Sequence, residues 1–232
     1  MSVQTKITGY WDRRADSYQH DQESQAGAAE YAAEWARIWR SALPKPHADV
    51  LDVGTGTGHV ALTIAELGHR VTGVDLAQQM LAKAHHNAAT RGLEVRWVVG
   101  DAVAPDFAEA SFDAVSGRYL VWTLREIDRA LRNWHALIRP GGRLALVDGL
   151  WFPLGMATFE TMADHYDQEV RSALELAEAP SMDPWLDRVE AAGFVDVQIE
   201  PLDDLYRLDS IHGVAPGHEL TQQYLITARR SS

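Results

Sequence analysis

From residue 49 onward, short apolar runs alternate with longer helical stretches, and this alternation constrains the fold more than any other feature of the sequence. The apolar runs are Val50–Val53, Arg70–Val74, Val95–Val99, Phe112–Ser116 and Arg143–Val147, and the helical stretches lie near His59–Leu67, Gln78–Thr90 and Arg125–Ile138. Such alternation is typical of a parallel sheet with helices on both faces, and near-continuous apolar runs fit strands that are buried on both faces. We therefore predict an α/β fold.

The first 43 residues have helical character and precede this alternation. Tyr31, Trp35, Ile38 and Trp39 recur at helical spacing, which predicts one apolar face that packs in the core rather than in a substrate pocket. The prolines of Leu43–Pro46 end any helix there.

After residue 150 the regular pattern is interrupted. Residues 151–182 are rich in aromatic residues and methionine and are only partly helical, so we expect an insertion or lid here. Asp183 and Pro184 are expected to be the N-cap and first residue of a helix that runs to Ala192 and is ended by Gly193. Two last strands are predicted at 196–200 and 223–228; their connection carries no clear helix, which favours an antiparallel last strand.

Composition excludes several classes of protein. The chain has 33 acidic and 21 Lys or Arg residues, a net charge of −12, which disfavours binding to a nucleic-acid backbone. It has no cysteine, and therefore no disulfide, zinc–thiolate site or cysteine nucleophile. No apolar run approaches the ~20 residues of a membrane span and no signal peptide is evident, so we expect a cytoplasmic protein without membrane contact. The scarcity of lysine suggests a bacterial genome rich in G and C.

Polar and glycine residues collect where the predicted strands end, which is the edge at which open α/β sheets bind ligands. The first strand leads into Gly54, Gly56 and Gly58; His59 stands where a dinucleotide fingerprint needs glycine, and the P-loop ending is absent. Asp75 ends the second strand, where a carboxylate can accept both ribose hydroxyls. With Asp101 placed to accept from an adenine amine, these residues predict an adenosine-type site without a phosphate cradle.

Five segments, in this order and spacing, resemble the motifs of class I S-adenosylmethionine-dependent methyltransferases. They are Asp52–Gly58, Asp75–Leu81, Gly100–Ala102, Phe112–Val115 and Leu137–Leu144. The resemblance covers roughly residues 10–150 and is to the branch with ubiquinone/menaquinone-type and many secondary-metabolite enzymes. It implies a Rossmann-like, seven-stranded, mostly parallel sheet with the last strand antiparallel. It also implies one methyltransferase domain: an N-terminal helical cover (1–45), a cofactor-binding core (46–150), a lid insertion after strand five (151–182) and a C-terminal helix with two strands (183–232).

The resemblance also implies roles for single residues. The glycines and Asp52 would border the methionine part of S-adenosylmethionine, Asp75 would hold the ribose, Met80 would flank the adenine and Asp101 would bond its amine. The expected cofactor contacts are Asp52, Gly54, Gly56, Gly58, Asp75, Leu76, Met80, Asp101, Ala102, Arg118 and Tyr18. Ala77 departs from the family, in which a small polar residue is common at this position; the loss of such a helix cap costs roughly 1 kcal/mol.

Some of these residues could instead have a purely structural role. Asp52 could brace the loop, Met80 could be plain core, and Arg118 could pair with a nearby carboxylate. His85 and His86 are expected to be solvated rather than metal ligands, and no metal site is predicted. Pro140–Gly142 is expected to be a turn that directs the fifth strand.

The acceptor side is less defined. His165 is the weakly supported candidate for a catalytic base, and Trp11, Tyr119, Trp151 and Tyr166 are candidates for acceptor contacts. The expected function is transfer of a methyl group to a small-molecule acceptor in bacterial secondary metabolism, with S-adenosylhomocysteine as product. The acceptor atom stays open among oxygen, nitrogen and carbon; a prenyl diphosphate is one option, because Arg118, Tyr119 and Arg125 could meet an anion. The alternatives are a cofactor-binding regulator without activity and, less favoured, a nicotinamide oxidoreductase. Either a monomer or a homodimer is compatible with the sequence.

Overall fold

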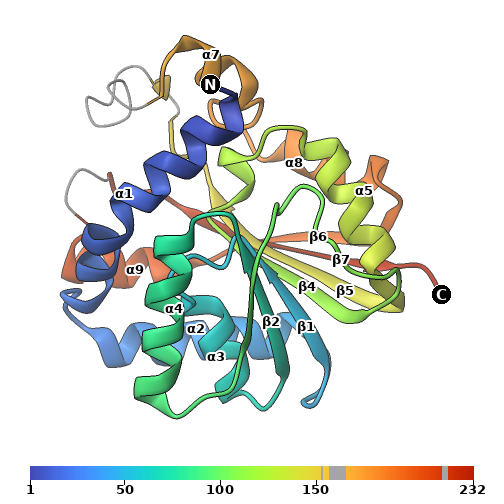
Figure 1. Ribbon diagram of the computed structural model, residues 1–232, viewed down its shortest axis with the longest axis horizontal. Coiled ribbons are helices and arrows are strands. Elements are labelled where there is room, and N and C mark those ends of the chain that lie inside the picture. The colour runs from blue at the N-terminus through green and yellow to red at the C-terminus, as the bar shows by residue number, and fades with distance from the viewer. Residues whose placement is uncertain (153, 157–165, 216–218) are drawn as a thin grey trace.

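The computed structural model describes residues 1–152, 154–156, 166–215 and 219–232, and these residues form seven strands in one sheet (Figure 1). The strands are β1 Asp49–Val53, β2 Arg70–Asp75, β3 Arg96–Val99, β4 Phe112–Arg118, β5 Ile138–Gly149, β6 Phe194–Pro201 and β7 Gln223–Arg230. Their order is β3-β2-β1-β4-β5-β7-β6, and β7 runs antiparallel to both of its neighbours. The predicted mostly parallel sheet with an antiparallel last strand is therefore confirmed.

Helices cover both faces of this sheet (Figure 1). In the described residues they are α1 Val3–Glu23, α2 Ala28–Ala42, α3 His59–Glu66, α4 Gln78–Arg91, α5 Ile127–Leu137, α7 Gln168–Ala173, α8 Asp183–Ala191 and α9 Asp203–His212, with a 3-10 turn, η1, at Val121–Thr123. The helices predicted from residues 59, 78 and 125 and in the first 43 residues are all present, with bounds that differ by a few residues.

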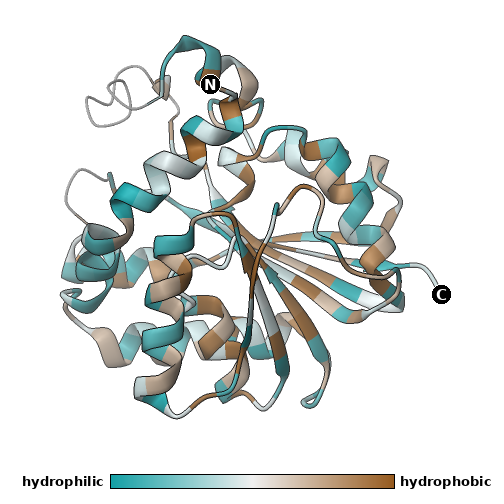
Figure 2. Cartoon of the chain, viewed as in Figure 1, coloured by the Kyte–Doolittle hydropathy of each residue, from teal (hydrophilic) through white to brown (hydrophobic). Residues whose placement is uncertain are grey.

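The alternation of side chains along the strands divides the core in two. Val50 and Ala145 face α2, α3 and α9, whereas the next residues, Leu51 and Leu146, face α5 and α8. The predicted apolar face of α2 is part of the first layer, and Trp39 is completely buried, so its expected role in the core is confirmed. In Figure 2 the strands combine brown segments with white and teal ones, whereas much of α1 is teal or white.

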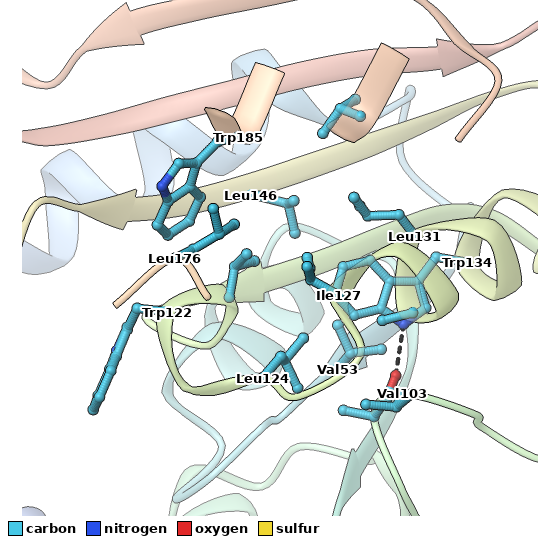
Figure 3. Close-up of a cluster of buried hydrophobic side chains, with 14 of the residues drawn as sticks. Val53, Val103, Trp122, Leu124, Ile127, Leu131, Trp134, Leu146, Leu176 and Trp185 are labelled. Carbon is cyan, nitrogen blue, oxygen red and sulfur yellow. Dashed lines mark hydrogen bonds between the residues drawn. The ribbon is translucent and has the colours of Figure 1, made fainter. Parts of the chain in front are cut away.

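The second layer also fixes a loop at the ligand edge of the sheet. Trp134 of α5 is packed among Val53, Leu131 and Leu146, and its indole N–H donates to the carbonyl of Ala102 at 2.7 Å (Figure 3). The loop after β3, which carries Asp101, is thus tied to the core by a buried hydrogen bond.

Three local predictions need correction. The connection between β6 and β7, expected to lack a helix, contains α9, in which Leu205 and Leu208 share a buried face against α2. The N-cap of α8 is Met182, so Asp183 is already the first helical residue. The expected turn at Pro140–Gly142 lies inside the long strand β5, where the pairing with β4 shifts register.

Candidate functional site

A cleft with about 910 Å³ of empty space, open solvent included, lies at the carboxyl ends of the central strands, beneath α1. The sequence-predicted residues that line it are Trp11, Tyr18, Asp52, Gly54, Gly56, Asp75, Leu76, Met80, Asp101, Ala102, Arg118 and Tyr119. Four strand ends and the first helix therefore bring together residues that are more than 100 positions apart in the sequence.

The glycine loop between β1 and α3 turns three times into the left-handed region. Gly54, Gly56 and Gly58 have φ values of +60°, +54° and +83°, which residues other than glycine rarely adopt. A Cβ atom at Gly54 would lie 2.4 Å from the side chain of Leu120, and one at Gly58 would lie 2.8 Å from Trp97. At Gly56 nothing lies within 4 Å, because this position opens into the cleft. Gly58 is not part of the lining; it precedes α3 and lets the loop pack.

Asp75, at the end of β2, is held by the backbone on both sides. One carboxylate oxygen accepts the N–H of Gly56 at 2.8 Å, and the other accepts the N–H of Ala77 at 2.8 Å. Burial raises the pKa of this carboxyl group, and these backbone hydrogen bonds oppose the rise. Each oxygen keeps a lone pair, so Asp75 can accept two further hydrogen bonds from a ligand in the cleft.

Asp52 both braces the loop and faces the cleft. Its two oxygens accept the hydroxyl groups of Thr55 at 2.6 Å and Ser116 at 2.9 Å, which ties β1 to the loop and to β4. Burial raises the pKa of Asp52 to about 7, although the hydroxyl donors and the nearby Arg118 lower it. A cationic ligand beside Asp52 would favour its ionised form.

Asp101 is engaged by its own loop and by a cation. One oxygen accepts the N–H of Val103 at 2.9 Å, and the other lies 2.6 Å from the guanidinium of Arg125. Arg125 also contacts Gln4 of α1. The suggestion that Arg125 could meet an anionic acceptor is therefore not supported, because its charge is paired with Asp101.

Arg118 does not make the carboxylate pair that was one reading of the sequence. Its guanidinium carbon lies 4.8 Å from the ring centre of Trp35 and 4.6 Å from that of Tyr119, and in the described part of the chain no carboxylate forms an ion pair with it. Two aromatic rings thus hold an unpaired cation at the wall of the cleft. Its position beside a ligand space suits recognition of an anionic group.

Met80 is both a core residue and part of the cleft wall. It is buried against Ala15 of α1 and Ala77, and it also lines the cleft. His85 and His86 are exposed on α4, as expected.

Of the four candidates for acceptor contacts, Trp11 and Tyr119 line the cleft and the other two do not. The ring of Trp151 packs edge-on against that of Tyr119 at 4.9 Å, and its N–H donates to Asp148. Tyr166 is completely buried, with its hydroxyl 3.2 Å from that of Thr123. His165 lies outside the described residues.

Several lining residues escaped the sequence analysis. These are Gln4, Ile7, Thr8, Gln22, Thr55, Thr57, His59, Val60, Ala77, Leu120, Thr123 and Leu124. The loop residues among them adjoin the glycine motif, so their positions could have been inferred from it. Those of α1 belong to a largely polar helix that has no local feature of a ligand site.

His59 is the most informative of these residues. Its Nε2 atom is buried and has no hydrogen-bond partner among the described residues. Burial and the nearby Arg118 lower its pKa well below the ordinary value, so the imidazole stays neutral at physiological pH. A neutral imidazole can both donate and accept a hydrogen bond.

The residues that the structure describes contain neither a candidate membrane span nor a candidate metal site. None of their helices is long and apolar enough to cross a membrane. Nor do their His, Asp and Glu side chains form a group of three that could hold a metal ion.

Comparisons with known proteins agree with this geometry. Residues 50–142 match the family model of a methyltransferase domain. The demethylmenaquinone methyltransferase of Thermus thermophilus is 39% identical over 109 residues, which cover 46% of this chain and 50% of that protein. A ubiquinone/menaquinone biosynthesis C-methyltransferase of Paracoccus denitrificans is 29% identical over 173 residues, 71% of this chain and 66% of that one. The matches thus span between half and two thirds of the length of these relatives.

A solved structure extends the likeness to the whole fold. The phosphoethanolamine N-methyltransferase 2 of Haemonchus contortus, determined with S-adenosylhomocysteine, superposes with a TM-score of 0.71 over 100% of this chain and 61% of its own, at 19% identity. Three of the five motifs, Asp52–Gly58, Asp75–Leu81 and Gly100–Ala102, lie at the carboxyl edge of the sheet, whereas the other two lie where β4 and β5 begin. The glycine turn opens into the cleft, and the family model matches residues 50–142. Within residues 50–142 this chain therefore matches a methyltransferase domain, and its fold is the one that S-adenosylmethionine-dependent methyltransferases share.

Proposed function

We propose that this protein transfers a methyl group from S-adenosylmethionine to a small-molecule acceptor. The observation that carries the proposal is Asp75, whose two oxygens are oriented by backbone N–H groups and border the cleft. This arrangement suits the two hydroxyl groups of a ribose. The open side of Gly56 adds the room that a ligand lying along the loop needs.

The other predicted residues have compatible places around such a ligand. Asp52 and Arg118, at the ends of β1 and β4, offer opposite charges to the ammonium and carboxylate of the methionine part. Met80 and Asp101 fit the faces and the amine of the adenine. We assign the same end of the cleft to Leu76 and Ala102, the methionine end to Gly54 and Gly56, and a position against the cofactor under α1 to Tyr18.

The bound cofactor supplies a methyl group already activated by a positively charged sulfur. With the cofactor bound, the acceptor atom would take the methyl group, the carbon–sulfur bond would break with its electron pair left on sulfur, and an acceptor that carries a hydrogen at that atom would release a proton to water. What the protein adds is alignment of the two reactants and exclusion of water, which together contribute up to about 7–11 kcal/mol in favourable cases. The acidic side chains at the cleft suit the cationic cofactor.

The remaining wall favours an apolar acceptor. This wall is formed by the apolar side chains of Ile7, Trp11, Leu120 and Leu124. A ring carbon of a hydroquinone-type acceptor fits this surface, because the reduced ring, unlike the quinone, is electron-rich enough to accept the methyl group. Two relatives are named for menaquinone or ubiquinone biosynthesis. A role in secondary metabolism stays a prediction.

Proton removal by the described residues is limited. The hydroxyl group of Tyr119 donates to Gln223, and burial raises its pKa, so it is a poor base. His59 is neutral but weakly basic, because its pKa is lowered. The site thus favours an acceptor that is already nucleophilic. The assignment of His165 as base, of residues 151–182 as a lid and of the four segments of the chain remains a prediction.

The test combines ligand binding with turnover. We expect S-adenosylhomocysteine at about 100 times its Kd to add about 2.7 kcal/mol to the free energy of unfolding, raising the Tm by several degrees, and NAD to have no effect. Radiolabelled methyl transfer is then measured with phenols, amines and hydroxylated naphthalenes. Binding with transfer to at least one acceptor supports the proposal. Binding without transfer to any acceptor favours the regulator, and the absence of binding refutes both.

A further inference from the structure

Helix α4 begins without a cap of its own. Its N-cap residue, Ala77, has no side chain that can accept a hydrogen bond, and the first turn contains no acidic residue. Ala77 is also buried against Ala15 of α1 and Met80, so its methyl group is part of the contact between the two helices. A small apolar residue lets α1 approach closely but leaves the first N–H groups of α4 without an acceptor from their own helix.

The missing acceptor comes from α1. The Oδ1 atom of Asp12 accepts the backbone N–H of Gln79 at 2.9 Å, across 67 residues of sequence. Gln79 is the second residue of α4, where a side-chain cap normally bonds. A carboxylate here also interacts favourably with the positive end of the helix.

The same turn holds the carboxylate assigned to the ribose. Asp75 accepts the N–H of Ala77, two residues before the N–H that Asp12 accepts. The charge of Asp12 is close enough to raise the pKa of Asp75. Two carboxylates, one from the sheet edge and one from α1, thus hold a single turn of backbone.

We propose that Asp12 is a positioning residue for Asp75: by capping α4 from α1, it couples closure of α1 over the cleft to the orientation of the ribose-binding carboxylate. The inference rests on the proposed function, because it assigns Asp75 to the cofactor. Its consequence is that ligand binding and the closed position of α1 support each other.

The other contacts between α1 and α4 provide matched controls. Asp16 forms an ion pair with Lys83 at 2.6 Å, one turn further along both helices, and its side chain is 90% exposed. Its removal takes a carboxylate from the same interface without touching the turn that holds Asp75. An exposed pair of this kind contributes little to stability.

The experiment measures the Kd of S-adenosylhomocysteine by calorimetry for the unaltered protein, Asp12→Ala, Asp12→Asn and Asp16→Ala. Hydrogen exchange of α1 is followed with and without the ligand. We expect Asp12→Ala to raise the Kd about five-fold, the effect of losing a typical cap. Asp12→Asn, which keeps an oxygen acceptor, and Asp16→Ala should stay within about two-fold. The ligand should protect α1 amides in the unaltered protein and much less in Asp12→Ala.

A purely structural cap would lower the Tm of Asp12→Ala and leave both its Kd and the ligand-induced protection of α1 unchanged; that result overturns the inference. Equal weakening by Asp12→Ala and Asp16→Ala also overturns it, because it would reflect loss of charge alone. If the unaltered protein does not bind S-adenosylhomocysteine, the proposed function fails and the inference fails with it. Binding by the unaltered protein with no effect of Asp12→Ala refutes the inference alone.

Discussion

The cleft has a floor, residues 52–58 with Asp75, and a roof, helix α1, and different interactions hold the two in place. In α3, which continues the floor, five of eight residues are buried, whereas α1 buries three of 21. The roof is fixed partly by Ile7 and Tyr10, which join the hydrophobic core, and partly by polar contacts near the surface, such as those of Lys6 with Asp167 and Asp16 with Lys83. Exposed ion pairs contribute about 0–1 kcal/mol each, so the roof should open far more readily than the floor. We therefore expect the floor to contribute most of the binding specificity and the roof to control access to the cleft.

Asp75→Ala is expected to have the largest effect, because it removes the carboxylate that we assign to two ribose hydroxyls. Hydrogen bonds to a charged group contribute about 1.5–3 kcal/mol each, so the Kd of S-adenosylhomocysteine should rise by about 100-fold or more in calorimetry. Asp106→Ala, an exposed carboxylate outside the cleft, is the control and should bind normally. Binding that survives Asp75→Ala within ten-fold would contradict this assignment.

Asp52 in the floor should make both the stability of the protein and its affinity for the ligand depend on pH, with an effect of intermediate size. Its pKa is raised to about 7 from 3.8, so its contribution to stability is complete below the unfolded value and is lost as the pH rises through about 7. We expect the free energy of unfolding of the ligand-free protein to decrease over that range in denaturant titrations. The affinity for S-adenosylhomocysteine, whose ammonium needs an ionised partner, should increase over the same range. Asp52→Asn should flatten the affinity profile and only reduce the slope of the stability profile, because burial also raises the pKa of Asp148 to about 7. An affinity slope that persists in this variant would assign that titration to another group.

A substitution in the roof should have the smallest effect on the affinity for S-adenosylhomocysteine. Gln22 accepts a hydrogen bond from Thr57 at 2.8 Å and ties the end of α1 to the glycine loop. We expect Gln22→Ala to raise the Kd less than about three-fold, because a neutral hydrogen bond contributes about 1 kcal/mol or less. Hydrogen exchange in α1 should nevertheless become faster, while exchange in α3 stays unchanged. If α3 also exchanged faster, floor and roof would form one cooperative unit, and the contrast drawn above would be wrong.

Much of the floor was predictable because its determinants are local. The apolar run of β1, the three glycines and the carboxylate of Asp75 follow from the periodicity of strands and from the conformations that only glycine adopts freely. The helix α9 escaped prediction because Leu205 and Leu208 become an apolar face only when α2 packs against them. The same holds for Gln4 and Thr8, which line the cleft from a helix that has no local feature of a ligand site.

The sequence by itself determined the order of the strands and of all the main helices except α9, the edge of the sheet at which we propose that a ligand binds, and the carboxylates and glycines gathered there. These follow from hydrophobic periodicity and backbone stereochemistry, which act over a few residues. Only the tertiary structure decided how charges and caps are shared: Arg125 with Asp101, Arg118 between two aromatic rings, and Asp12 on α4. Such pairings join residues that are distant in sequence, and packing of the apolar core, not any local pattern, brings them within bonding distance.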